Sequence, residues 1–469
     1  MATVVFLQRD PIEWLGLMYL SSTLKANGHN TRMVIDALEP EGALEAALTE
    51  PADLYAFSPL VTDFRWALDQ AASLKARRDV PVVLGGTHVT LNPEETLAHP
   101  AVDVVCRGEG EAPLLELAEA VAEGREVAGI ANLWSKHNGS LVRNEMRDLV
   151  TDLDSLPPPD RDLYAHYPPL RALGKRPLHI GRGCPYGCTY CHNARKRELY
   201  RGKGPYLRWR SVDNVLAEVE ELARGSFFKV LHFVDDGFGL KEDWLVEFLP
   251  RLGRMFERRP AIFANMRADM VTEGLCAAFR DYGADRFRLR IAVECGDERY
   301  RREVLRKTIS DADLKRAAEL LHSSGVGFAT YNMVGLPGES LDQALKTLRL
   351  NIELKPQHVF CFLYQPFPGT DLADYAVECG SVDAATLSGA GAGNRDFLGT
   401  FEGRSPLRQG NGSELENLQR LFALVVRFPV LRPLAERLVR IRRLAPVLRL
   451  VYQAYIRAFV FFRRREDAY

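Results

Sequence analysis

Three cysteines lie close together in this chain: Cys184, Cys188 and Cys191, spaced as C-x3-C-x2-C. Cysteine thiolates at short spacing can bind iron, and a cubic [4Fe-4S] cluster is normally held by four of them. Because only three cysteines are near one another here, a cluster bound by them would keep one iron without a protein ligand. An open position on iron can take up a small molecule and react with it. The trio therefore predicts a reactive iron–sulfur site.

Clustered cysteines also bind structural zinc, which normally takes four ligands and often takes them from two Cys pairs. The sequence has no second C-x2-C pair, although His192 follows Cys191 directly and can supply a fourth ligand. A disulfide is not expected, because three cysteines cannot pair among themselves and no basic secretory leader precedes residues 3–7. The spacing by itself favours the cluster and leaves zinc as the alternative.

The composition excludes several classes of protein. With 469 residues, 46% of them hydrophobic and 26% charged, the chain has the make-up of a soluble globular protein of two or three domains. Its formal net charge of −1 provides no overall attraction to nucleic acid, so no nucleic-acid partner is expected. No long charge-free apolar run predicts a membrane span. Eight cysteines, five of them scattered, suit a reducing compartment, and we expect a cytoplasmic protein.

The first 130 residues alternate short apolar runs with amphipathic stretches. Strands are expected at residues 3–7, 32–36, 53–58, 81–86 and 102–106, with helices at 15–27 and 64–77. This alternation predicts an α/β domain with a doubly wound parallel sheet, whose ligands bind at the carboxyl ends of the strands. Glycine and small polar residues gather at those ends, and the candidate ligand-binding residues are Ser58, Gly85, Gly86, His88, Gly108, Glu109 and Gly110.

A second series of strands follows a proline-rich connection. We expect a linker at residues 131–175, a domain at 176–380 and a loop with a helical region at 381–469. Strands are expected at 177–181, 229–234, 261–265, 286–293, 326–334 and 358–364, with helical stretches between them. Six βα units form a partial barrel. The cysteines follow the first of these strands, which is the end of a barrel strand where catalytic loops lie.

The run from residue 183 to residue 193 resembles the signature of the radical S-adenosylmethionine (radical SAM) enzymes, including the aromatic Tyr190 before the third cysteine. The resemblance implies that Cys184, Cys188 and Cys191 hold a [4Fe-4S] cluster. It also implies that the amino and carboxylate groups of SAM chelate the open iron. Electron transfer from the reduced cluster then releases a 5′-deoxyadenosyl radical.

Later strand ends are similar to other elements of the same family. Asp235 and Asp236 look like the acidic pair near the SAM amine, where a carboxylate makes a charge-assisted hydrogen bond. Glu294 resembles the acid that reaches the ribose, although Cys295 stands where a serine is common. Gly335 looks like the residue beside the adenine, and Pro366 belongs to a run like the one that closes the sixth strand. The resemblance therefore implies a SAM site made by Tyr190, Asp235, Asp236, Glu294, Gly335 and Pro366.

The N-terminal third looks like the cobalamin-binding domain that is often fused to radical SAM barrels. The resemblance rests on residues 15–20, on the Gly85-Gly86-x-His88 run and on residues 107–111. It implies that the strand-end residues named above form a corrinoid pocket. The chain has no Asp-x-His-x-x-Gly, which supplies an axial histidine in another cobalamin-binding group, so no protein histidine is expected on cobalt. His88 as a pocket residue and His88 as a hydrogen-bonded loop histidine both stay open.

The C-terminal part combines a loop rich in small residues with a basic helical segment. Residues 383–413 are expected to form a flexible loop, a candidate lid, because glycine, alanine and serine dominate them. Residues 414–462 read as helical and carry many arginines among apolar residues. Such a helix most often packs its apolar face on a neighbouring domain. It can also lie on an anionic membrane, which would make a peripheral membrane contact, or bind an acidic partner.

Three interpretations of function follow from the resemblance. The first is a cobalamin-dependent radical SAM C-methyltransferase, in which one SAM yields the radical and a second SAM supplies a methyl group through cobalamin. Its substrate is expected to be a small molecule, a secondary metabolite or a lipid-like compound, and its electron donor a protein such as flavodoxin or ferredoxin. The second is the same architecture catalysing cyclisation, ring rearrangement or dehydration, with or without cobalamin. The third, a cobalamin or iron–sulfur sensor, is disfavoured because a sensor needs no SAM-like site. No residue is assigned a catalytic role.

Overall fold

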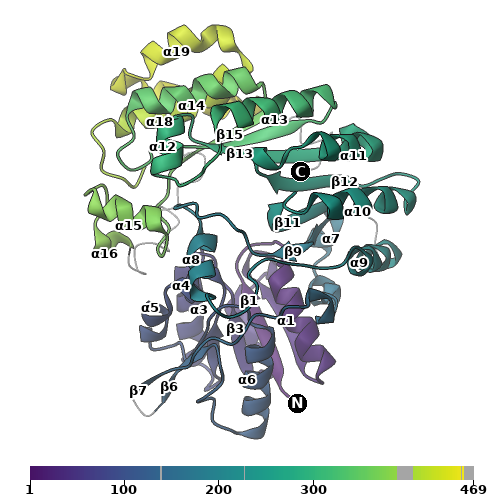
Figure 1. The fold of residues 1–469 in the computed structure, drawn as a ribbon. Helices are drawn as coiled ribbons and strands as arrows, with labels where there is room; N and C mark the ends of the chain where they lie inside the picture. The colour runs from purple at the N-terminus through teal and green to yellow at the C-terminus, as the bar shows by residue number, and fades with distance from the viewer. Residues whose placement is uncertain (138–139, 226–227, 388–404, 456, 459–469) are drawn as a thin grey trace.

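The computed structural model describes residues 1–469 except 138–139, 226–227, 388–404, 456 and 459–469. The chain forms an N-terminal α/β domain, a second α/β domain and a layer of C-terminal helices. These parts follow one another from bottom to top in Figure 1. The carboxyl ends of the N-terminal strands face the second domain, and the short helix α8 (His192–Leu199) lies between the two domains.

The N-terminal sheet has the strand order β2-β1-β3-β4-β5-β6-β7. Its strands are β1 (Thr3–Gln8), β2 (Asn30–Ile35), β3 (Leu54–Phe57), β4 (Val82–Leu84), β5 (Val104–Cys106), β6 (Leu133–His137) and β7 (Ser140–Arg143). The first five pair in parallel, so the five predicted strands and the doubly wound sheet are confirmed. The chain runs from β1 outward to β2 and then returns to β3 on the other side. The strand order therefore reverses between β1 and β3, where such sheets bind ligands.

Helices cover both faces of this sheet. They are α1 (Leu15–Ala26), α2 (Ala43–Leu48), α3 (Phe64–Lys75), α4 (Thr87–Leu91), α5 (Pro93–Ala98) and α6 (Glu111–Glu123). Two separate apolar clusters fill the two sides, one that includes α1 and α6 and one that includes α2 and α3. The strands are apolar on both faces because both faces are buried, as is usual in parallel sheets.

The first sheet includes residues beyond position 130, where the sequence predicted the end of the first domain. Strands β6 and β7 form a hairpin that pairs antiparallel with β5, so the sheet is mixed and continues to Arg143. After this hairpin, η2 (Leu153–Ser155), η3 (Arg161–Tyr164) and α7 (Pro168–Ala172) lead to the second domain. Tyr164 Oη donates to Gln8 Oε1 at 2.7 Å, and Tyr167 Oη accepts from the Ile35 N–H at 2.9 Å. The predicted linker is therefore packed against the first domain.

The second sheet has the order β15-β14-β13-β12-β11-β8, and all of its neighbouring strands are parallel. Its strands are β8 (Lys175–Leu178), β11 (Val230–Phe238), β12 (Ala261–Met266), β13 (Phe287–Glu294), β14 (Phe328–Val334) and β15 (His358–Leu363). Helices α9 (Val212–Gly225), α10 (Glu242–Arg254), α11 (Glu273–Gly283), α12 (Glu298–Glu303), α13 (Asp311–Ser323) and α14 (Leu341–Leu354) stand between them. Because β8 and β15 do not pair, the sheet is an open, partial barrel, as predicted.

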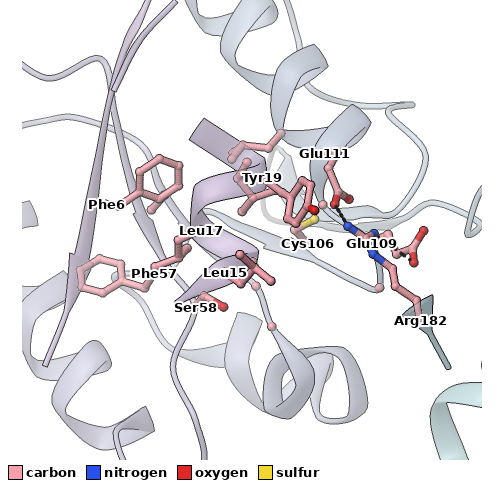
Figure 2. Close-up of a pocket in the computed structure, with 18 of the residues that line it drawn as sticks. Phe6, Leu15, Leu17, Tyr19, Phe57, Ser58, Cys106, Glu109, Glu111 and Arg182 are labelled. Atoms are coloured by element: carbon pink, nitrogen blue, oxygen red, sulfur yellow. Dashed lines mark hydrogen bonds and ion pairs between the residues drawn. The ribbon is translucent and has the colours of Figure 1, made fainter. Parts of the chain in front are cut away.

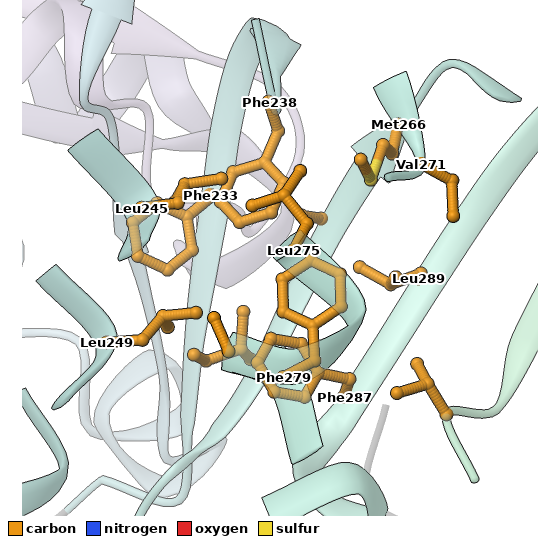
Figure 3. Close-up of a cluster of buried hydrophobic side chains, with 14 of the residues drawn as sticks. Phe233, Phe238, Leu245, Leu249, Met266, Val271, Leu275, Phe279, Phe287 and Leu289 are labelled. Atoms are coloured by element: carbon orange, nitrogen blue, oxygen red, sulfur yellow. The ribbon is translucent and has the colours of Figure 1, made fainter. Parts of the chain in front are cut away.

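The barrel strands bury one face under the surrounding helices. In β13, Phe287, Leu289, Ile291 and Val293 are buried and alternate with partly exposed residues, which is the two-residue period of a strand. Figure 3 shows Phe287 and Leu289 among aromatic and aliphatic side chains from β11, α10 and α11. This core fixes the strands, and the carboxyl ends of the strands then carry the candidate site residues.

The C-terminal region is helical but not one continuous helix. Its helices are α15 (Asp371–Glu378), α16 (Ala384–Leu387), α18 (Gly412–Arg427), η6 (Pro429–Leu431), α19 (Arg432–Leu438), η7 (Arg442–Leu444) and α20 (Ala445–Tyr455). The breaks coincide with Pro429, Pro433 and Pro446, each within the first two residues of a new helix, because proline fits the first turn and not the interior. Most of the predicted lid, residues 388–404, lies outside the described residues. None of the helices described is both long and apolar enough to cross a membrane.

Candidate functional site

A cavity of about 330 Å³ lies where the carboxyl ends of the N-terminal strands face the second domain. From the first domain it is lined by Phe6 on β1, by Ala56 and Phe57 on β3, and by the start of α1 (Figure 2). The second domain supplies the opposite wall with His179, Gly181, Arg182, Val234 and Asp236. The cavity therefore sits at the β1/β3 reversal and is shared by both domains, a common location for a cofactor site.

Six of the seven residues proposed from the sequence for corrinoid binding line this cavity. They are Ser58, Gly85, Gly86, Gly108, Glu109 and Gly110, which follow β3, β4 and β5. A Cβ added at Gly86 would stand 2.7 Å from Ser58 Oγ, and the residue has φ +91°. Only glycine fits this backbone next to Ser58 without displacing it. The small residues of this wall let a ligand approach the backbone closely. Corrinoid binding by these residues stays a prediction.

His88 is the candidate that does not line the cavity. It lies on α4, is 2% exposed, and packs its ring against Phe64 with 4.4 Å between ring centroids. Burial lowers the pKa of His88 to about 4, so the ring is neutral near pH 7. His179 lines the cavity instead, and its Nδ1 lies 3.4 Å from Tyr19 Oη. The sequence did not predict His179 at the cavity, because this residue follows β8 in the second domain.

Arg182 joins the two domains at the rim of the cavity. Its guanidinium lies 2.6 Å from Glu111 Oε1 and 3.2 Å from Glu109 Oε1, and Figure 2 shows it reaching toward both. Burial alone would lower the pKa of Arg182, but the two carboxylates outweigh it and raise that pKa. Arg208 adds a bidentate pair with Glu109, at 2.7 and 3.0 Å. Glu109 is therefore held by barrel arginines as well as lining the cavity.

Tyr200 makes a second contact with the same loop of the first domain. It follows α8, and its Oη accepts a hydrogen bond from the Glu109 N–H at 2.7 Å. Gly108 has φ +78°, and a Cβ added there would overlap Tyr200 Oη. Arg182, Tyr200 and Arg208 were not found from the sequence. Arg182 stands two residues before Cys184, but nothing in the pattern shows that its partner lies in another domain.

We expect Arg182→Gln to weaken corrinoid binding, because Glu111 loses its cation and Glu109 loses one of its two, in a contact that is mostly buried. Breaking such a pair costs about 3 kcal/mol, and at least a tenfold rise in the corrinoid dissociation constant should follow in an absorbance titration. Arg143→Gln is the matched control, since Arg143 pairs with Glu94 at 2.9 Å where both side chains are more than half exposed. The control should change the constant by less than about twofold. Equal effects would show that Arg182 does not hold the cavity together.

The cysteine loop begins directly after β9 (Gly181–Arg182), which pairs with β10 (Arg208–Trp209). Cys188 is buried, while Cys184 and Cys191 are partly exposed. Burial raises the pKa of Cys184, and it raises that of Cys191 to about 11, so a metal must displace protons from these thiols. Arg267 donates to Cys188 Sγ at 3.9 Å and can offset thiolate charge.

The donor set fits an iron–sulfur cluster. Within the part of the chain that the structure describes, no three His, Cys, Asp or Glu residues form a group that could hold a metal ion. The thiolates of a cubane bind separate irons, so they need not converge on one point as the ligands of zinc do. His192, the fourth ligand considered for zinc, stacks on Phe367 with 5.9 Å between ring centroids. Cluster binding by the three cysteines stays a prediction.

Asp235 and Asp236 have different environments although they are neighbours. Asp235 Oδ1 accepts from the N–H groups of Ile180 and Gly181, both at 2.8 Å, and so holds the chain just before the cysteine loop. Burial raises the pKa of Asp235 to about 7. Asp236 accepts from Asn193 Nδ2 at 2.8 Å and lines the cavity. Asp236 is therefore the better placed of the two to meet a ligand.

Glu294 lies at the end of β13 with a φ of +68°, a backbone strain that functional sites often carry. Its Oε1 accepts from Tyr190 Oη at 3.1 Å and from Lys307 Nζ at 3.4 Å. Tyr190 and Glu294, both proposed from the sequence for SAM, are thus brought together, and Lys307 was missed. Cys295 is fully buried, and its Sγ donates to the Asp297 carbonyl at 3.9 Å.

Gly335 follows β14 and is held by Glu339. Glu339 Oε2 accepts from the Gly335 and Leu336 N–H groups at 2.7 and 3.1 Å. Pro366 is buried beyond the end of β15, next to Gln365, whose amide nitrogen and oxygen are buried without a partner among the described residues. The unpartnered amide points to a polar ligand at this strand end. The assignment of the six residues to SAM stays a prediction.

We expect stability to fall with rising pH through Glu339. Burial raises the pKa of Glu339 to about 8 from the usual 4.5, against the two N–H groups, which lower it. Between these values the folded chain keeps a proton that the unfolded chain has lost, so stability decreases as pH rises toward 8. The Glu339→Gln variant does not lose stability through this group. Asp235 still lowers the stability of both proteins as the pH rises, because its pKa is raised too. The wild-type unfolding temperature should therefore drop roughly 2–4 °C more than that of the variant between pH 6 and 9. Parallel curves would contradict this.

Comparisons with known proteins match each of the two α/β domains. The sequence model of the radical SAM superfamily matches residues 178–350, and that of the B12 binding domain matches residues 7–118. The chain is 29% identical over 307 residues to an uncharacterized methyltransferase of Pyrococcus horikoshii, covering 64% of this chain and 63% of the relative. It is 26% identical over 389 residues to the anaerobic magnesium-protoporphyrin IX monomethyl ester cyclase of Rubrivivax gelatinosus, covering 77% and 65%. The chain thus spans slightly less than two thirds of either relative.

Solved structures show the same fold. The radical S-adenosylmethionine methyltransferase TsrM from Kitasatospora setae, with cobalamin and a [4Fe-4S] cluster bound, matches with a TM-score of 0.68 and 17% identity, covering 94% of this chain and 99% of that one. The cobalamin-dependent radical enzyme OxsB matches with a TM-score of 0.63 and 17% identity, covering 80% and 55%. The order of the two α/β domains is therefore common to all three proteins.

Proposed function

Because this chain belongs to the radical SAM superfamily and carries a B12-binding domain, we propose that it is a cobalamin-dependent radical SAM methyltransferase acting on an unactivated carbon of a small molecule. The observation that carries the proposal is the shared wall of the cavity. Arg182 and Asp236 line the cavity on the barrel side, while Arg182 precedes the cysteine loop and Asp236 binds Asn193 just after it. A methyl carrier in the cavity would therefore lie next to the place where a radical is made.

The three cysteines would hold the cluster, the strand-end residues of the first domain would hold cobalamin, and Tyr190, Asp236, Glu294 and Gly335 would hold SAM. The cluster supplies the electron that splits SAM, and cobalamin supplies the methyl group. Asp236 can accept a hydrogen bond from the ammonium group of SAM. Asn193, two residues after the third cysteine, donates to Asp236 and so holds this carboxylate next to the cysteine loop. Glu294, oriented by Tyr190 and Lys307, can accept from ribose hydroxyls.

A ring-forming reaction is the second candidate, because two relatives are named as cyclases. The open barrel fits either reaction, since fold does not fix chemistry. The placement of the cavity against the cysteine loop favours methyl transfer, which needs a carrier close to the radical. The proposed small-molecule substrate is supported by the TsrM structure that was solved with its substrate tryptophan bound.

The decisive experiment reconstitutes the full chain without oxygen, measures iron, sulfide and bound corrinoid, and then adds reductant and SAM with a deuterated methyl group. S-adenosylhomocysteine that forms only when corrinoid is bound, together with 5′-deoxyadenosine, supports methyl transfer. 5′-Deoxyadenosine without corrinoid-dependent S-adenosylhomocysteine would favour the ring-forming reaction. Failure to bind corrinoid at saturation would remove the methyltransferase proposal.

A further inference from the structure

The helices after residue 427 carry an apolar surface that faces solvent. Among the described residues, sixteen large hydrophobic side chains are exposed, and seven of these lie within residues 428–451. We call these seven the C-terminal face: Phe428, Val430, Leu434, Ile441, Val447, Leu450 and Val451. Val430 is 85% exposed and Leu450 66% exposed. Single exposed hydrophobics are ordinary, but such a concentration marks an interaction surface.

The same helices already bury a different side. Ala435 in α19, Val439 directly after it, and Leu448 and Tyr452 in α20 are buried, and most of them join the core with α14, α18 and β15. The packing expected from the sequence is therefore present, yet it uses only one side of each helix. A helix that is apolar on its outer side as well is expected to bury that side against a second surface. The helices that the structure describes do not provide this surface.

The charged residues around the C-terminal face are mostly positive. Residues 427–457 hold eight arginines and a single acidic residue, Glu436, whereas the whole chain has a net charge of −1. Glu436 is bound by Arg349 at 2.9 Å. Arg437 and Arg443 are exposed and have no ion-pair partner among the described residues. The surface is thus cationic and aliphatic together, which is the composition that binds anionic lipid headgroups and shallow acyl chains.

We propose that the C-terminal face docks on the surface of an anionic lipid bilayer. Helix α20 has 11 residues, about 16 Å, so it can lie on the interface but not cross it. The exposed side chains are aliphatic apart from Phe428, whereas the centres of protein interfaces are enriched in aromatic residues. In Figure 1 these helices lie at the opposite end of the molecule from the N-terminal sheet, so docking would leave the cavity accessible.

The test is co-sedimentation of the full chain with phosphatidylcholine vesicles that contain or lack phosphatidylglycerol. Binding should require the anionic lipid and should weaken as salt is raised. Arg437→Gln with Arg443→Gln, and separately Leu434→Gln with Leu450→Gln, should each lower partitioning by roughly tenfold or more. The matched control is Val246→Gln with Arg254→Gln on α10, an exposed apolar and basic pair elsewhere, and it should bind as the wild type does.

Three results would overturn the proposal. One is equal binding to neutral and anionic vesicles, and another is no sedimentation with either. The third is a lipid-independent dimer, seen by light scattering, that the Leu434 and Leu450 changes dissolve; it would assign the face to a second copy of the chain. None of these results depends on the catalytic reaction, so they leave the proposed function untouched.

Discussion

Replacing Cys188 with alanine should reduce iron binding and SAM cleavage to background. Cys188 is the most buried of the three cysteines and receives a hydrogen bond from Arg267 at 3.9 Å. With two thiolates left, the cluster has too few ligands to persist. Anaerobic reconstitution followed by iron and sulfide analysis, visible absorbance and chromatography of 5′-deoxyadenosine would measure both losses.

Cys276→Ala is the matched control for this experiment. Cys276 is also buried in the second domain, where it is part of the apolar core and not of the cysteine loop. The change removes one sulfur from that core and should leave iron content and SAM cleavage near wild-type values. Normal SAM cleavage in Cys188→Ala would contradict the cluster assignment. Equal losses of iron and of SAM cleavage in both variants would indicate a folding defect instead.

Gly108→Ala should produce the second large effect, a loss of corrinoid binding. The new methyl group would overlap Tyr200 Oη, and the backbone at φ +78° disfavours any side chain. The loop that carries Glu109 would then move away from Tyr200 and Arg208, and the cavity would change shape. We expect the corrinoid dissociation constant to rise by at least tenfold, measured by absorbance titration under anaerobic conditions.

Gly124→Ala separates the two causes of this effect. Gly124 ends α6 in the same domain with φ +65°, but nothing lies within 4 Å of the Cβ that would be added there. An alanine at position 124 therefore has the same kind of backbone strain, about 1–2 kcal/mol, but overlaps no neighbouring atom. The control should lower the unfolding temperature slightly and leave corrinoid affinity unchanged. Equal affinities in the two variants would show that contact with Tyr200 does not shape the cavity.

Local patterns predicted the parts of the site that local chemistry determines. The cysteine loop follows a strand, and glycines such as Gly85 and Gly108 follow β4 and β5, so their convergence could be inferred from the parallel sheet alone. The breaks in the C-terminal helix were also present in the sequence, at Pro429, Pro433 and Pro446, although we expected one helical segment.

Contacts between the domains could not be predicted in this way. Arg182, Tyr200 and Arg208 find their partners about 70 to 100 residues away in the chain, and a single sequence contains no signal for such pairs. The burial of His88 against Phe64 depends on how α4 is seated, which the glycine run does not specify. The hairpin β6–β7 falls within the predicted linker, a prediction that rested on the prolines at 157–159. The hairpin residues, including Lys136 and His137, lack the apolar run of the central strands and so give no strong strand signal.

Helix α8 connects the third cysteine to Tyr200 with no break between them. It starts at His192 and ends at Leu199, and eight helical residues measure about 12 Å. Since Tyr200 holds the loop at Gly108 and Glu109, the length of α8 would set the distance between a cluster on the cysteines and a corrinoid in the cavity. Adding one residue to α8 would advance Tyr200 by about 1.5 Å and turn it by about 100°. A change in that distance would therefore require matched changes in α8 and in the loop at residues 108–110.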